Sequence, residues 1–163
     1  MMGGSIRRNP WTGGGNERTF TRVAALIDTN ILVYRFDWRY SVKGRIATEL
    51  LRQGLMERSV RIPHQAIVEF VAAVTRPRIN GEALLSQAEA HREAEELLSQ
   101  FVVLYPTGDV LRTALRGAAA YQLSWFDAHL WAYAEFYGLP ELLSEDFEHD
   151  RMYGTVRAIN PFR

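Results

Sequence analysis

Acidic residues that end short apolar runs are the side chains in this sequence best suited to chemistry. Asp28 directly follows the apolar run at 23–27, and Asp146 comes just after the apolar stretch at 142–144. A short, continuous apolar run is typical of a strand that is buried on both faces of a parallel sheet. Ligands of such sheets bind beyond the carboxyl ends of the strands, and we expect both acids to lie there.

Two further acids, Glu69 and Asp127, are expected near the same edge. Glu69 falls in the second turn of a predicted helix, on a face of small apolar residues with no basic residue one turn away. A plain surface position remains an alternative for Glu69. Asp127 begins an apolar helix face, but its spacing from Ser124 is also that of a capping box. Asp28 is equally well placed to cap a helix, so capping stays open for both aspartates.

Four carboxylates at one edge indicate a metal site. Carboxylates a few ångströms apart cannot all stay ionised unless a cation binds. Oxygen ligands without cysteine or clustered histidine favour Mg²⁺ or Mn²⁺, and such an ion can activate water for phosphodiester hydrolysis. None of the histidines has ligand spacing: His64, His91, His129 and His149. We therefore expect the catalytic residues and the metal ligands to be the same four: Asp28, Glu69, Asp127 and Asp146.

Polar neighbours of these acids are secondary candidates. Asn30, two residues after Asp28, could hydrogen-bond a carboxylate and orient it. The loop after 144 is rich in acids, and Glu145, Glu148 and Asp150 are weaker candidates than Asp146. Asp150 could reach a second metal. Arg35, Trp38, Arg39 and Tyr40 are possible RNA contacts, although exposed loop residues without a role are the plainer interpretation.

These acids must be positioned by alternating strands and helices. The patterns predict strands at 23–27, 60–62, 101–104, 141–144 and 156–159, and helices at 31–34, 43–57, 63–76, 82–99, 108–121 and 125–137. Strands separated by helices predict an α/β fold with a parallel sheet and right-handed crossovers. Residues 1–20 are glycine-rich without apolar periodicity and are expected to be a flexible leader or a cloning remnant, followed by a single domain at 21–163.

Bulk composition excludes several classes of protein. The 163 residues are 47% hydrophobic and 23% charged, as in an ordinary globular protein. Cysteine is absent, so disulfides, thiolate zinc sites and a thiol nucleophile are excluded. The 19 basic and 19 acidic residues balance, so no overall field attracts nucleic acid. No signal peptide and no membrane-spanning apolar run of ~20 residues is found, so we expect a cytoplasmic protein with no membrane association.

Four blocks of sequence together resemble the PIN-domain nucleases, and most closely the small VapC-type toxins of bacterial toxin–antitoxin pairs. The blocks are Leu26–Tyr34, Val68–Phe70, Ser124–Ala128 and Leu143–Phe147, and the ending Gly154–Phe162 also resembles one branch of that family. The likeness covers about residues 23–162. Asp150 departs from that branch, which tends to have glycine at this position.

The resemblance implies a five-stranded parallel sheet with helices on both faces. It also implies that the four acids bind Mg²⁺ or Mn²⁺ and that Asn30 and Ser144 support them. Family members are metal-dependent endoribonucleases, often homodimers, that a cognate antitoxin silences. The expected function is therefore Mg²⁺/Mn²⁺-dependent hydrolysis of RNA by the toxin of a type II toxin–antitoxin pair.

Two other functions remain open. In a non-catalytic PIN-like module that binds RNA or protein, the acids would only cap helices. In a phosphotransferase, Asp28 would be the nucleophile, but position 30 is asparagine where the Asp-x-Asp strand end of such enzymes needs a second acid. The phosphotransferase is the weakest of the three hypotheses.

Overall fold

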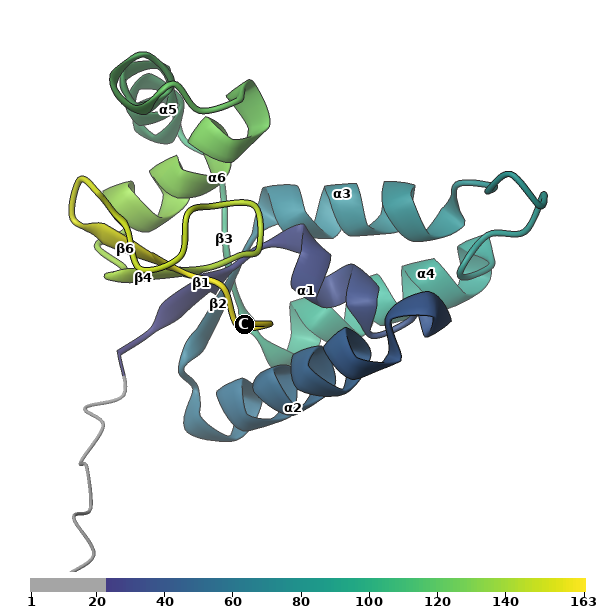
Figure 1. Ribbon diagram of the computed structural model, residues 1–163. Coiled ribbons are helices and arrows are strands. Elements are labelled where there is room, and N and C mark those ends of the chain that lie inside the picture. Colours follow the sequence, from purple (N-terminus) through teal and green to yellow (C-terminus); the bar gives the residue numbers. More distant parts are fainter. Residues whose placement is uncertain (1–22) are drawn as a thin grey trace, which may run out of the picture.

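The computed structural model describes residues 23–163, so the predicted leader at 1–20 lies outside the described residues. Its elements follow one another as strands separated by helices (Figure 1). They are β1 (Ala25–Ile27), α1 (Thr29–Tyr34), the 3₁₀ helix η1 (Trp38–Tyr40), α2 (Ser41–Glu57), β2 (Val60–Pro63), α3 (His64–Thr75), α4 (Gln87–Gln100), β3 (Val102–Leu104), α5 (Gly108–Tyr121), α6 (Trp125–Phe136), β4 (Glu141–Leu143), β5 (Met152–Tyr153) and β6 (Val156–Ile159).

The sheet has six strands in the order β3-β2-β1-β4-β6-β5. Five of them are parallel, as predicted, whereas β5 runs antiparallel to β6 at the edge. The prediction of five strands was therefore one strand short, because β5 is only two residues long and shows no alternation that a pattern could reveal. The α/β class with a mostly parallel sheet is confirmed.

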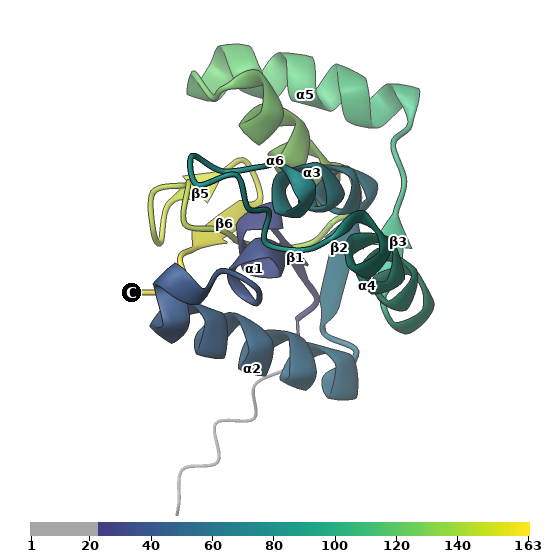
Figure 2. The same ribbon diagram turned by 90° about the vertical axis from the view of Figure 1, so that its right-hand side faces the viewer.

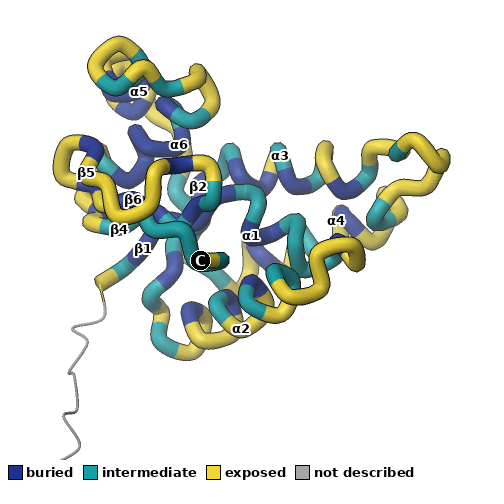
Figure 3. The backbone as a smooth tube through the Cα atoms, in the orientation of Figure 1, coloured by how far each residue is buried: buried dark blue, intermediate teal, exposed yellow. Residues whose placement is uncertain are grey.

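Helices cover both faces of the sheet (Figures 1 and 2). One core packs α1 to α4 against a face that includes Ile27 and Ile62, and the other packs α5 and α6 against Leu26 and Leu142. Both faces of β1 are therefore buried, which explains its uninterrupted apolar sequence. Figure 3 shows the buried residues concentrated along the strands and on the inner sides of the helices.

One helix begins later than predicted. We expected a helix at 82–99, but α4 starts at Gln87. Ser86 is its N-cap and forms a capping box with Glu89, since each side chain hydrogen-bonds the backbone of the other residue. No helix within residues 23–163 is both long and apolar enough to cross a membrane.

Candidate active site

Asp28 lies at the carboxyl end of the central strand β1, against the end of β4. The backbone N–H of Asp28 donates to Leu143 O at 3.0 Å, which joins the two strand ends. Asp28 is only 6% exposed, and its Oδ1 accepts from the backbone N–H of Thr29 at 2.5 Å. The predicted capping role is thus confirmed. Oδ2 accepts from Ser144 Oγ at 2.5 Å, so only one carboxylate oxygen is used for capping.

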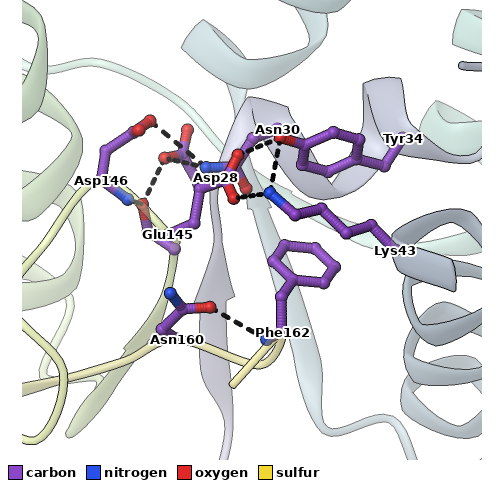
Figure 4. A network of polar contacts seen from close by, with 9 residues as sticks. Asp28, Asn30, Tyr34, Lys43, Glu145, Asp146, Asn160 and Phe162 are labelled. Carbon is purple, nitrogen blue, oxygen red and sulfur yellow. Dashed lines mark hydrogen bonds and ion pairs between the residues drawn. The ribbon is translucent and has the colours of Figure 1, made fainter. Parts of the chain in front are cut away.

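Asn30 joins the two aspartates that the strand ends bring together (Figure 4). Its Nδ2 donates to Asp28 Oδ2 at 3.1 Å and to Asp146 Oδ2 at 3.3 Å. Ser144 Oγ also accepts from the backbone N–H of Asp146 at 3.0 Å, which ties the acidic loop to the buried carboxylate. The Oδ1 atom of Asn30 is buried and has no hydrogen-bond partner. A buried acceptor without a partner is unusual, and a cation could satisfy it.

Glu69 reaches the site from α3, which packs against α1. Thr29 Oγ1 donates to Glu69 Oε2 at 3.0 Å, and Gln65 Nε2 donates to Oε1 at 2.7 Å. The Gln65 side-chain oxygen lies 2.6 Å from Nδ1 of His129 on α6, so α3 and α6 together fix this glutamine. Glu69 therefore accepts hydrogen bonds from two neutral side chains.

Asp127 occupies the first turn of α6. Its Oδ2 accepts from Ser124 Oγ at 2.6 Å, and its backbone N–H donates to the same hydroxyl at 3.2 Å. The N-cap role predicted for Ser124 is confirmed. The half-buried Asp127 carboxylate is also near enough to Asp146 to raise the pKa of that aspartate. The capping contact does not remove Asp127 from the acidic cluster.

Burial and mutual repulsion disfavour the ionised forms of these acids. The pKa of Asp28 is raised to about 7, with burial as the largest cause. The charges of Asp146 and Glu69 also raise this pKa, whereas the hydrogen bond from Ser144 lowers it. Partial burial and the charges of Asp127 and Glu145 likewise raise the pKa of Asp146. Within residues 23–163, no ion pair with a basic side chain offsets any of the four candidate acids.

The four carboxylates do not surround one point. In the described part of the chain, no three acidic, histidine or cysteine side chains are arranged so that they could hold a metal ion as they stand. Asp28 and Asp146 are instead linked through Asn30 and Ser144, while Glu69 and Asp127 contact neutral residues of their own helices and of α1.

The weaker candidates in the acidic loop lie elsewhere. Asp150 has a positive φ of 67° and directs its carboxylate to Arg157, whose Nε donates to Oδ1 at 2.5 Å. Glu148 pairs with Arg151 at 2.9 Å. The structure therefore does not bring Asp150 to the acidic cluster, where we had considered it for a second metal.

The side chains considered for RNA binding are mostly engaged within the protein. Arg35 pairs with Glu93 at 3.2 Å, and Arg39 pairs with the buried Asp37 at 2.8 Å. Tyr40 packs edge-on against Tyr34. Trp38 is 76% exposed.

Three residues that hold this site were not singled out from the sequence. Thr29 and Gln65 hydrogen-bond Glu69, and Lys43 pairs with Glu145 at 2.5 Å. Gln65 lies one helical turn before Glu69, and that spacing could have indicated the contact. Lys43 is the sole lysine of the chain, but its partner is distant in sequence and no pattern signals it.

The chain belongs to the PIN domain family, whose model matches residues 25–154. Solved structures with a similar fold include a toxin–antitoxin complex from Klebsiella pneumoniae, at 20% identity and a TM-score of 0.60 over 85% of this chain and 98% of that chain. DNA-bound VapBC from Salmonella typhimurium has 13% identity and a TM-score of 0.62 over 83% and 96% of the two chains.

A third similar structure is the sarcin–ricin loop cleaving toxin VapC20 of Mycobacterium tuberculosis. It has 16% identity and a TM-score of 0.54 over 73% of this chain and 87% of that chain. No curated protein sequence matches the chain. At these identities the structural likeness establishes the fold, whereas the family match establishes membership of the PIN domain family.

Proposed function

We propose that this protein is a Mg²⁺- or Mn²⁺-dependent endoribonuclease that hydrolyses RNA phosphodiester bonds. The proposal rests on one observation: at the carboxyl edge of the sheet, the side-chain amide of Asn30 donates hydrogen bonds to both Asp28 and Asp146. Burial raises the pKa of both aspartates, and the Oδ1 atom of Asn30 beside them is buried without a hydrogen-bond partner. These oxygen atoms are donors that suit a hard divalent cation.

The acids have separate roles in this proposal. Asp28, Asp127 and Asp146 would hold the ion, and Glu69 would be either a further ligand or the base for the attacking water. Asn30 and Ser144 would keep Asp28 oriented. A bound divalent ion supplies a water of lowered pKa and stabilises charge on the phosphoryl oxygen. Glu69, held by Thr29 and Gln65 and free of any ion pair in the described residues, could accept a proton from the attacking water.

Removal of the metal tests this function directly. RNA cleavage by the purified protein should stop in EDTA and return when Mn²⁺ is added in excess. Calorimetry should show Mn²⁺ binding to the wild type that weakens by about tenfold or more in Asp146→Asn, because a ligand is lost. Cleavage that persists in EDTA would refute the metal dependence. If the protein does not cleave RNA and Mn²⁺ binds no more weakly to Asp146→Asn, the chain would instead be the non-catalytic module considered above.

We further propose that the protein is the toxin of a toxin–antitoxin pair. Support comes from the similar folds in the toxin–antitoxin complex of Klebsiella pneumoniae and in VapBC of Salmonella typhimurium. A cognate antitoxin and a homodimer follow from the same proposal. Co-expression with the product of a small adjacent reading frame should abolish cleavage, and the two proteins should co-purify.

A further inference from the structure

Lys43 is the centre of a polar and aromatic cluster beside the acidic loop (Figure 4). Its Nζ donates to Glu145 Oε2 at 2.5 Å and to the Tyr34 hydroxyl at 3.1 Å. The Tyr34 hydroxyl in turn donates to the other carboxylate oxygen of Glu145. Both oxygens of Glu145 are thus held, one by α1 and one by α2. Lys43 of α2, Tyr34 of α1 and Glu145 of the loop after β4 therefore each contact the other two.

Aromatic rings enclose the same lysine. The ammonium group lies 4.7 Å from the ring centroid of Tyr34 and 5.5 Å from those of Tyr40 and Phe162. The ring of Tyr34 also packs edge-on against Phe162 at 5.2 Å. A cation above several aromatic faces is attracted by each of them, and its long side chain is thereby held in one conformation. The Lys43 side chain remains only 32% exposed.

Glu145 directly precedes Asp146, so whatever holds Glu145 also holds the backbone that carries Asp146. That backbone is also held by the hydrogen bond from Asp146 N–H to Ser144 Oγ on one side and by the buried ring of Phe147 on the other. We propose that Lys43 and Tyr34 are positioning residues that fix the Asp146 loop through Glu145 and so preorganise the site for its metal ion. This inference rests on the proposed metal-dependent function.

A positioning role and a purely electrostatic role of Lys43 predict opposite changes in Mn²⁺ affinity for the variant Lys43→Met. Lys43→Met leaves the Glu145 carboxylate without its cation, so the site becomes more negative and attracts Mn²⁺ more strongly if charge alone matters. Glu145→Gln removes a negative charge and would weaken Mn²⁺ binding. If positioning dominates, both substitutions weaken binding, because both release the loop. The sign of the effect of Lys43→Met therefore separates the two explanations.

Calorimetric titration with Mn²⁺, without RNA, is the deciding experiment. We expect the Mn²⁺ dissociation constant to rise about tenfold in Lys43→Met and about threefold in Tyr34→Phe, which loses only the hydroxyl and keeps the ring contacts. The double variant Lys43→Met/Glu145→Gln should bind no more weakly than the worse single variant, because the residues act through one contact. Arg52→Met is the matched control, since it removes an exposed cation paired with Glu49 on the same helix and should leave binding unchanged.

Three results would overturn the inference. The first is tighter Mn²⁺ binding in Lys43→Met, and the second is unchanged Mn²⁺ binding in both Lys43→Met and Tyr34→Phe. The third is a higher KM for RNA in Lys43→Met with unchanged Mn²⁺ affinity, which would make Lys43 a phosphate contact. Circular dichroism of each variant checks folding, and Tyr34→Phe provides the answer if Lys43→Met does not fold. Wild-type protein that binds no Mn²⁺ at all would instead refute the proposed function, so the two failures are distinguishable.

Discussion

Asp28→Asn is expected to abolish Mn²⁺-dependent RNA cleavage, with a rate loss of at least about 1000-fold. Such a loss corresponds to about 4 kcal/mol of transition-state stabilisation, in the range that a metal ion contributes. Asparagine has nearly the same shape as aspartate, so the packing at the end of β1 should persist. Cleavage of a defined RNA under single-turnover conditions measures the effect. Full activity in this variant would refute the assignment of the site.

The same variant should lose activity without losing stability. The pKa of Asp28 is about 7 in the folded protein, above its ordinary value of 3.8. The stability that the protonated acid contributes is therefore present below pH 3.8 and is lost as the pH rises through about 7. Asp28→Asn cannot ionise, so in EDTA at pH 8 it should unfold at a temperature no lower than the wild type. A much lower unfolding temperature would mean that the activity loss reflects misfolding.

Gly117→Val is expected to destabilise the fold by about 3 kcal/mol, through the contact between α5 and α6. A Cβ at Gly117 would lie 2.1 Å from the ring of Trp131, far inside van der Waals contact. The ring cannot easily move away, because Trp131 is buried and its indole N–H donates to the backbone oxygen of Tyr153 at 2.8 Å. The strain would therefore reach β5 at the edge of the sheet.

Urea unfolding followed by circular dichroism measures this effect. Ala119→Val is the matched control, since it places the same side chain on the exposed side of α5 and changes mainly helix propensity. That control should cost less than about 1 kcal/mol. Equal stability of the two variants would show that the Trp131 ring repacks and that Gly117 is not required for close approach of the helices.

Most of the sheet could be predicted from the sequence, and so could the proximity of Asp28 and Asp146, which follow the carboxyl ends of β1 and β4. The run before Asp28 is apolar at every position because both faces of β1 are covered, and that pattern also predicts where its carboxyl end lies. The late start of α4 was missed although Ser86 and Glu89 have capping-box spacing, because the apolar positions just before Ser86 were assigned to the helix. Leu84 and Leu85 instead pack into the core from the loop.

Contacts within the acidic loop could not be predicted, because they depend on backbone conformation rather than on periodicity. Asp146 and Asp150 are both acids that follow β4, yet one faces Asn30 and the other faces Arg157. The positive φ of Asp150 decides the second direction, and nothing in a single sequence specifies that angle for an aspartate. Glu145, next to Asp146, instead contacts Lys43, which lies 102 residues earlier in the chain.

The order of the strands has a consequence for synthesis on the ribosome. Asp28 lies near the start of the chain, but Ser144, its hydrogen-bond partner, comes 116 residues later. The neighbouring strand β4 and its acidic loop are thus translated long after β1. If the protein is the proposed ribonuclease, an unfinished polypeptide lacks the β4 side of the acidic site, so a nascent chain would not cleave the messenger or the ribosome that is producing it. Activity would begin only after nearly the whole protein has been made.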